Sequence, residues 1–210
     1  MNQQSNNYRE KIIIFTRYPK PGASKTRLIP ALGAEGAANL QKQMTEQIIR
    51  QARLTGQHRQ AELEVRFTGA SKAEIYSWLP AEIPCLPQGK GDLGDRLARA
   101  FMASFTSADK TITVGADCPA LTHKIITKAL DHLTNFDLVL GPAHDGGYYL
   151  IGLKDYQPEL FNSIPWGTEE VLTITIARAK KKGLSIFQLE TLFDVDRPED
   201  IRHFNNNSSD

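Results

Sequence analysis

The segment at residues 15–28, FTRYPKPGASKTRL, follows an apolar run and has the composition of an anion-binding loop. Its basic residues are Arg17, Lys20, Lys25 and Arg27. The backbone N–H groups that could face an anion belong to Gly22, Ala23 and Ser24. A solvated basic turn is the alternative interpretation. The position of the loop directly after a strand-like run favours a phosphate site.

The end of this loop resembles the phosphate-binding motif of P-loop NTPases only in part. That motif reads G-x-x-x-x-G-K-[ST], and Lys25-Thr26 matches its last two positions. However, Pro19 and Ser24 occupy the places of its two glycines. The glycines let the backbone curl around a phosphate, so this chain is not predicted to be a P-loop NTPase.

An acidic residue stands at the end of a second buried run, in the sequence GADCP at 115–119. An acid at the carboxyl end of a strand, followed by a proline that restrains the chain, suits a Mg²⁺ or Mn²⁺ ligand. Phosphate oxygens would complete the coordination of the ion. Asp117 could equally form a turn that caps the next helix, and the two interpretations stay open at this point.

A third acidic group lies near the C-terminus, in FDVDRPED at 193–200. Asp194 and Asp196 are two residues apart, so an extended backbone would point both carboxylates to one side. A hard divalent cation relieves the repulsion between two such carboxylates. The alternative is an exposed acidic turn. Glu199 and Asp200 follow Pro198 and are expected to begin the last helix.

Two glycine-rich segments could complete a ligand site. In QGKGDLGDR at 88–96, the chain could close over a nucleobase or ribose, or Asp92 could simply be a helix N-cap. In GPAHDGGYYLIG at 141–152, the glycines after Asp145 allow a ligand or another backbone to come close. His144 in this segment is interpreted as incidental. Cys118 lies beside an acid, which disfavours the thiolate that a nucleophile requires.

The elements that must position these residues alternate between strands and helices. Strands are predicted at 11–15, 63–69, 111–117, 136–143, 147–153 and 184–190. Helices are predicted at 34–54, 71–79, 93–105, 122–133 and 168–183, with Ser71 and Thr122 as N-caps. This alternation predicts an α/β fold with a largely parallel sheet that helices cover on both faces. Ligands of such folds bind at the carboxyl ends of the strands, where the acids and the basic loop lie.

Composition sets limits on the function. The 210 residues carry a formal net charge of +1, which gives no reason to expect a nucleic acid or a membrane surface as partner. The apolar run at 12–15 is too short for a signal peptide or a membrane span. Two cysteines form no metal or disulfide pattern. We therefore expect a cytoplasmic protein with one domain at 11–204, a disordered tail at 1–10 and a second tail at 205–210.

Taken in order, five motifs resemble those of the glycosyltransferase-like family DUF2064. They are RYPKPGASKTRL, QGKGDLGDR, GADCPAL, GPAHDGGYYLIGL and DVDRPED. That family is similar in turn to 2-phospholactate (phosphoenolpyruvate) guanylyltransferase and to molybdenum-cofactor nucleotidylyltransferases. The resemblance covers roughly residues 11–200. It implies the Rossmann-like GT-A fold of nucleotide-diphospho-sugar transferases, which is a three-layer α/β/α fold around a mixed, mostly parallel sheet.

The resemblance also implies a role for each motif. The nucleotide would contact Arg17, Gly22, Ser24, Lys25, Arg27, Gln88, Gly91 and Asp92. A Mg²⁺ or Mn²⁺ ion would be held by Asp117, Asp194 and Asp196. The acceptor would lie against Asp145, Gly146 and Gly147, and the catalytic residues would be Lys25, Asp117 and Asp145. The basic loop has fewer glycines than the nucleotidylyltransferase signature, and GADCP replaces the D-x-D of many glycosyltransferases.

The sequence thus predicts a metal-dependent transferase that uses an NTP or a nucleotide sugar and a small acceptor. In nucleotidylyl transfer, an acceptor phosphate or carboxylate attacks the α-phosphorus and pyrophosphate leaves. In glycosyl transfer, a nucleoside diphosphate leaves and Asp145 takes the proton of an acceptor hydroxyl. The alternative is a non-catalytic protein of the same fold that senses nucleotides. Neither the nucleobase nor the oligomeric state follows from the sequence.

Overall fold

The computed structural model describes residues 9–205, so the predicted tails at 1–10 and 205–210 lie outside the described residues except for positions 9, 10 and 205. The first strand begins one residue earlier than predicted, at Glu10, whose side chain is buried. Arg9 precedes it and is held by Asp109, which accepts a hydrogen bond of 2.9 Å from the Arg9 backbone N–H. At the other end, the last helix continues to Asn205, one residue beyond the predicted boundary.

A seven-stranded sheet forms the middle layer, in the order β3-β2-β1-β4-β6-β5-β7. The strands are β1 (Glu10–Arg17), β2 (Glu62–Thr68), β3 (Cys85–Pro87), β4 (Lys110–Gly115), β5 (Leu138–Pro142), β6 (Tyr148–Leu153) and β7 (Ile186–Gln188). All neighbouring pairs are parallel except those of β6, which runs antiparallel to both β4 and β5. The prediction of a mixed, mostly parallel sheet is confirmed.

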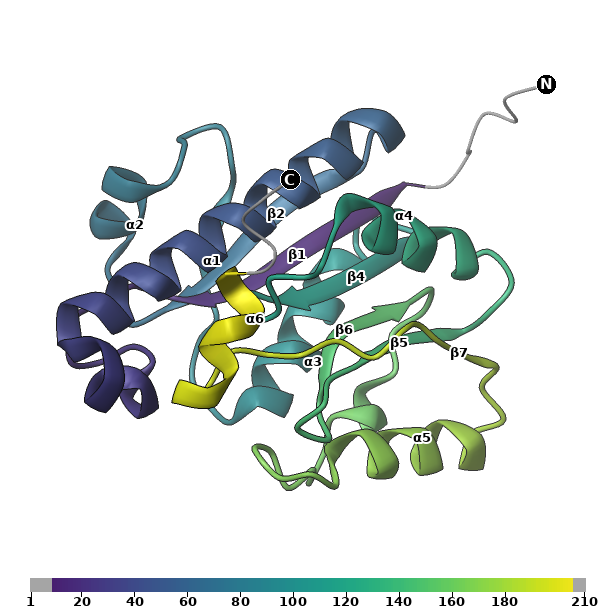
Figure 1. Ribbon diagram of the computed structural model, residues 1–210. Coiled ribbons are helices and arrows are strands. Elements are labelled where there is room, and N and C mark those ends of the chain that lie inside the picture. The colour runs from purple at the N-terminus through teal and green to yellow at the C-terminus, as the bar shows by residue number, and fades with distance from the viewer. Residues whose placement is uncertain (1–8, 206–210) are drawn as a thin grey trace.

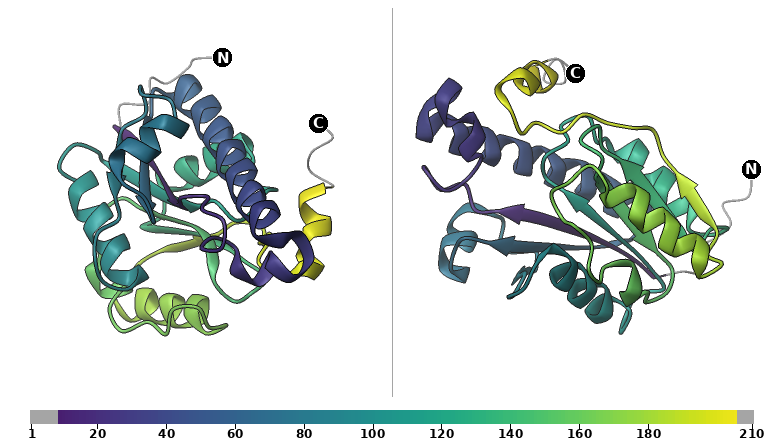
Figure 2. Two further views of the ribbon diagram at one scale, coloured as in Figure 1. Left: turned by 90° about the vertical axis from the view of Figure 1, so that its left-hand side faces the viewer. Right: turned by 90° about the horizontal axis from the view of Figure 1, so that it is seen from below.

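Helices cover both faces of the sheet (Figure 1; Figure 2). They are α1 (Ile29–Arg59), α2 (Lys72–Trp78), α3 (Leu93–Ser104), α4 (His123–His132), α5 (Val171–Lys181) and the short α6 (Ile201–Asn205). Helices α1, α2 and α4 pack in one hydrophobic cluster, and α3 and α5 pack in another on the opposite face. The predicted three-layer architecture is therefore confirmed.

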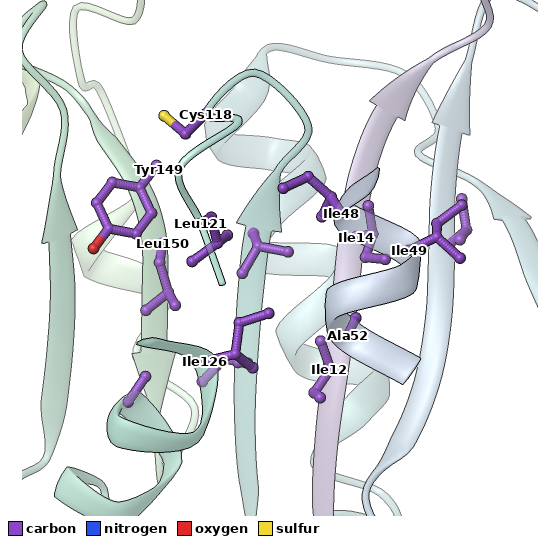
Figure 3. Packing of buried hydrophobic residues seen from close by; sticks show 14 of the residues in the cluster. Ile12, Ile14, Ile48, Ile49, Ala52, Cys118, Leu121, Ile126, Tyr149 and Leu150 are labelled. Carbon is purple, nitrogen blue, oxygen red and sulfur yellow. The ribbon is translucent and has the colours of Figure 1, made fainter. Parts of the chain in front are cut away.

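Strand β1 is buried on both faces because its side chains alternate between these two clusters. Ile12 and Ile14 face the α1 side, where Ile48 and Ala52 meet them (Figure 3). Ile13 and Phe15 point into the cluster of α3 and α5. Because both faces of β1 are anchored, the basic loop at its carboxyl end starts from a fixed position.

Several predicted boundaries differ from the observed ones. Helix α1 extends beyond the predicted range of 34–54, and its first turn is separated from the rest by Gly33, whose backbone (φ 70°, ψ 169°) is not helical. The short strand β3 was not predicted because it has three residues and ends at a proline. The predicted caps are confirmed, since Ser71 and Thr122 each accept a backbone N–H at the start of a helix.

Helix α5 and strand β7 are shorter than the predicted ranges of 168–183 and 184–190. The helix ends as predicted near Gly183, which has a left-handed φ of 73°. Within residues 9–205, no helix has the length and apolar character needed to cross a membrane.

Candidate functional site

A cavity of about 590 Å³ opens at the carboxyl ends of the central parallel strands, where ligands of such sheets bind. The loops after β1, β4 and β5 and the segment after β7 converge there. Nine of the predicted site residues line it: Arg17, Lys25, Arg27, Gln88, Asp117, Asp145, Gly147, Asp194 and Asp196. The structure thus brings the basic loop and the acids together.

Lys25 connects the basic loop to two acidic segments. Its ammonium lies 2.8 Å from Asp117 Oδ1, 3.8 Å from Asp196 Oδ1 and 2.7 Å from the carbonyl oxygen of Val195. The Lys25 side chain is only 5% exposed, whereas that of Asp117 is 52% exposed. The backbone of Lys25 is left-handed (φ 48°, ψ 45°), which is costly for a residue with a Cβ atom. Lys25 is therefore a buried cation held at the cavity wall.

The two late acids have different partners. The Asp196 carboxylate contacts the Arg27 guanidinium as well as Lys25. Asp200, in turn, accepts hydrogen bonds from the backbone N–H groups of Asp196 (3.2 Å) and Arg197 (2.8 Å). This confirms that Asp200 caps the start of the last helix. Asp196 is thus neutralised by protein cations.

Asp194 lies in a more negative environment. Burial and the charge of Asp145 raise the pKa of the Asp194 carboxyl to about 6, with a further contribution from Asp117. The same three carboxylates surround Cys118, and burial together with their charges raises the pKa of its thiol. Asp117, Asp145 and Asp194 therefore form one acidic cluster. Cys118 is unsuited to act as a nucleophile, as predicted.

Oxygen ligands of this kind suit Mg²⁺ or Mn²⁺, but the arrangement is not a preformed three-ligand centre. Over residues 9–205, no group of three Asp, Glu, His or Cys side chains is placed to hold a metal ion. Magnesium sites commonly use one or two carboxylates and take their other ligands from substrate phosphates and water. Asp117 and Asp194 fit that type of site. Asp117 does not cap the following helix, because Thr122 does so.

Five predicted site residues do not line the cavity, and the structure gives most of them local roles. They are Gly22, Ser24, Gly91, Asp92 and Gly146. Ser24 is fully buried, and its hydroxyl donates a hydrogen bond of 3.0 Å to the Lys20 carbonyl. Asp92 accepts a hydrogen bond of 2.9 Å from the backbone N–H of Asp95, which confirms the alternative that Asp92 caps a helix.

Gly146 shapes the loop after β5. Its φ is 87°, and a Cβ atom there would collide with the backbone of Glu169. The Leu172 backbone N–H donates a hydrogen bond of 2.9 Å to the Gly146 carbonyl. In the same loop, Asp145 Oδ1 accepts a hydrogen bond of 2.8 Å from the Gly147 N–H. The glycines therefore let the chain before α5 approach Asp145 closely.

His144, interpreted as incidental from the sequence, is part of an aromatic stack. Its ring lies 3.6 Å from that of Phe193, and Phe193 lies 4.1 Å from the ring of His203 in α6. The stack joins the loop after β5 to the segment that carries Asp194. His144 thus has a packing role beside the cavity.

Several residues of the cavity were not predicted from the sequence, among them Gln41, Thr68, Arg96, Tyr148, Trp166 and Thr168. Arg96 is one helical turn after Asp92 and donates to the Gly91 carbonyl (3.0 Å) and to Gln88 Oε1 (3.4 Å). Its position three to four residues after the helix start could have indicated this contact. Trp166 precedes α5 and belongs to none of the motifs, so no local signal marked it.

Comparisons with known proteins identify the family of the chain and relate its fold to solved structures. Residues 51–168 match the family model described as "Uncharacterized protein conserved in bacteria (DUF2064)". The chain belongs to this family, as the five motifs predicted. No curated protein matches the sequence.

Solved structures show the same fold. A candidate nucleotide-diphospho-sugar transferase from Desulfovibrio desulfuricans G20 is 31% identical, with a TM-score of 0.86 over 95% of this chain and 89% of that protein. The 4-diphosphocytidyl-2C-methyl-D-erythritol synthase of Anaerococcus prevotii is 10% identical (TM-score 0.62, 98% and 99% covered). Glucosyl-3-phosphoglycerate synthase of Mycobacterium tuberculosis, solved with Mn²⁺, UDP and phosphoglyceric acid, is 13% identical (TM-score 0.57, 93% and 74% covered). The fold is thus that of nucleotidyl- and glycosyltransferases.

Proposed function

We propose that the protein is a metal-dependent transferase that takes a group from a nucleotide-activated donor and passes it to a small acceptor. The observation that carries this proposal is the convergence of a buried cation, Lys25, and an acidic cluster in one cavity at the strand ends. A nucleotide-bearing structure of the same fold supports it, since the glucosyl-3-phosphoglycerate synthase structure holds UDP with Mn²⁺.

The donor phosphates would lie against the basic loop. Arg17, Lys25 and Arg27 all line the cavity there, and cations at this place stabilise charge that grows on a leaving phosphate. Lys25 would exchange part of its contact with Asp196 for a phosphate oxygen, because that contact is the longest of its three at 3.8 Å. Arg27 would remain paired with Asp196 and keep the loop in place.

A divalent ion would be held by Asp117 and Asp194, and it would supply charge neutralisation to the donor phosphates. Asp145 lines the same cavity, next to the glycines that shape its loop. Its carboxylate would orient the acceptor and take a proton from it. These roles require no catalytic histidine.

The test is a calorimetric panel of NTPs and nucleotide sugars with Mn²⁺ or Mg²⁺, followed by assays for released pyrophosphate and nucleoside diphosphate. We expect at least one nucleotide to bind in a metal-dependent manner and to be turned over with an acceptor. Pyrophosphate release would identify nucleotidylyl transfer, and nucleoside diphosphate release would identify glycosyl transfer. Binding without either product for any acceptor would contradict the proposal and favour the nucleotide sensor.

A further inference from the structure

One polar side chain in the cavity wall comes from helix α1 and belongs to none of the five motifs. Gln41 is only 4% exposed, yet it lines the cavity beside Thr16 of β1. Thr45, one helical turn after Gln41, is fully buried. The side chains of Gln41, Thr16 and Thr45 form one hydrogen-bonded group between α1 and β1.

The hydrogen bonds of this group fix the direction of the Gln41 amide. The hydroxyl oxygens of Thr16 and Thr45 are 2.8 Å apart, so one hydroxyl donates to the other. The second hydroxyl proton has a backbone acceptor, either the Gln41 carbonyl (2.9 Å from Thr45 Oγ1) or the Arg17 carbonyl (3.3 Å from Thr16 Oγ1). Since both protons are already donated, the amide group that faces the hydroxyls must itself donate. It is therefore the Gln41 nitrogen that lies 3.2 Å from Thr45 Oγ1 and 3.5 Å from Thr16 Oγ1.

This direction leaves the amide oxygen of Gln41 turned to the cavity. In the part of the chain that the structure describes, no group donates a hydrogen bond to Gln41 Oε1. The oxygen is not enclosed by protein either, because it is not among the unpaired side-chain atoms that are fully buried in that range. A fixed acceptor that opens on a binding cavity selects a ligand group that donates a hydrogen bond.

The surroundings of Gln41 indicate which part of the ligand it meets. The Thr16 carbonyl accepts a hydrogen bond of 3.1 Å from Gln88 Nε2, so Thr16 bonds to two amide side chains of the wall. Gln88 follows β3 and Thr68 ends β2, and both line the cavity. Gln41 therefore belongs to the wall at the ends of β1, β2 and β3, which are neighbours in the sheet. The proposed acceptor residue Asp145 follows β5 instead, with β4 and β6 in between.

The chemistry of the oxygen excludes the phosphates of the donor as its partner. Phosphate oxygens accept hydrogen bonds, and they would face a second acceptor at Gln41 Oε1. The nucleoside, in contrast, carries hydroxyl groups on its ribose and N–H groups on its base, and both donate. The nucleoside is thus the part of the donor that fits this wall.

We infer that Gln41 binds the nucleoside of the donor and that its Oε1 accepts a hydrogen bond from a ribose hydroxyl or a base N–H group. The inference rests on the proposed function and adds a specificity-determining residue to it. A site that is built to hydrogen-bond a substrate group discriminates against a ligand that lacks this group, because the buried partner then stays unpaired.

The test is a thermodynamic cycle between the residue and the ligand, measured by calorimetry in Mn²⁺. The parent ligand is the tightest-binding of the common ribonucleoside di- and triphosphates. Its 2′-deoxy, 3′-deoxy and singly N-methylated base forms, and the matching inorganic pyrophosphate or tripolyphosphate, are titrated into wild type, Gln41→Met and Gln43→Met. Methionine has nearly the size of glutamine but no amide oxygen. Gln43 is the matched control, because it is an exposed residue of the same helix and does not line the cavity.

We expect Gln41→Met to weaken binding of the parent nucleotide by roughly 5- to 150-fold, through the ligand donor that loses its partner. Affinity for the inorganic phosphate and the affinities of Gln43→Met should stay at the wild-type level. The loss should vanish for one analogue, and this analogue identifies the donor as a ribose hydroxyl or a base N–H.

Three results would overturn the inference: wild-type nucleotide affinity in Gln41→Met, an equal loss for the inorganic phosphate, or a loss that persists with every analogue. If Gln41→Met does not fold, Gln41→Asn gives the same comparison, since it keeps an amide but ends one bond shorter. If no nucleotide binds to the wild type, the proposed function fails and the inference fails with it. If nucleotides bind and Gln41 has no effect, only the inference fails.

Discussion

Replacing Lys25 should weaken both the fold and the nucleotide site, because its ammonium serves both. The ammonium donates to the Val195 carbonyl at 2.7 Å and pairs with Asp117 at 2.8 Å. The family resemblance implies for Lys25 only a nucleotide-binding and catalytic role. The structure shows instead a side chain that is 5% exposed and joins segments 170 residues apart.

The loss of stability expected for Lys25→Ala follows from the groups that no longer contact the Lys25 ammonium. A carbonyl left without its donor costs about 1–3 kcal/mol when it is buried, as the neighbourhood of Val195 is. The ion pair adds at most about 1 kcal/mol, because Asp117 is 52% exposed and water replaces the lysine there. Lys25→Ala should therefore lose about 2 kcal/mol, or roughly 4–8 °C in Tm for a domain of this size. Loss of one charged hydrogen bond to a donor phosphate should weaken nucleotide binding by roughly 10- to 150-fold.

The assay compares Lys25→Ala with Lys25→Gly by urea denaturation and calorimetry. Because φ is 48° at this position, glycine should be about 1 kcal/mol more stable than alanine there, while both lose nucleotide affinity equally. Gln60, also left-handed at φ 60° and exposed, is the matched control. Gln60→Gly and Gln60→Ala should differ in stability by a similar amount and leave affinity unchanged. Wild-type stability and wild-type affinity in Lys25→Ala would refute the reasoning.

Three further substitutions address separate parts of the structure. Asp117→Asn should abolish metal-dependent turnover, while the exposed control Asp155→Asn keeps it; near-normal turnover of Asp117→Asn at saturating Mg²⁺ would remove Asp117 from the site. Asp92→Ala should cost about 1 kcal/mol of stability through the lost N-cap and leave nucleotide affinity intact, and a loss of affinity alone would return Asp92 to the site. Hydrogen bonds from Ser185 lower the pKa of the Asp137 carboxyl to about 2, below its value in the unfolded chain. The ionised Asp137 therefore stabilises the fold fully above about pH 4, and this contribution is lost as the pH falls through about 2. Asp137→Asn should remove this acid dependence in denaturation curves measured between those pH values, and an unchanged curve would contradict the assignment.

The main strands, and the residues that follow the parallel ones, could be predicted because both depend on local sequence patterns. An uninterrupted apolar run such as Ile12–Phe15 is typical of a strand that is buried on both faces. Once such strands are parallel, the residues that follow them share one edge of the sheet. This reasoning is sufficient to bring Asp117 and the basic loop together, and the structure places both in the cavity.

Contacts made by distant residues could not be predicted in the same way. Lys25 contacts Asp196 and Val195 because the segment after β7 passes next to the loop after β1. The hydrophobic periodicity of the sequence predicts helices and strands but not such a contact between distant segments. Trp166 enters the cavity beside Gly94 of α3, where a Cβ atom would collide with the indole ring. Asp92 is the reverse case. The local sequence allowed it to be a helix N-cap, as the structure shows, whereas the family resemblance implied a contact with the nucleotide.

The most direct test of the central claim is calorimetric titration of nucleoside diphosphates and triphosphates into the protein with and without Mn²⁺. If the cavity at the strand ends is a metal-assisted nucleotide site, at least one nucleotide binds with 1:1 stoichiometry, and its affinity falls in both Lys25→Ala and Asp117→Asn. Absence of binding for every nucleotide, or binding that neither substitution affects, would contradict the account.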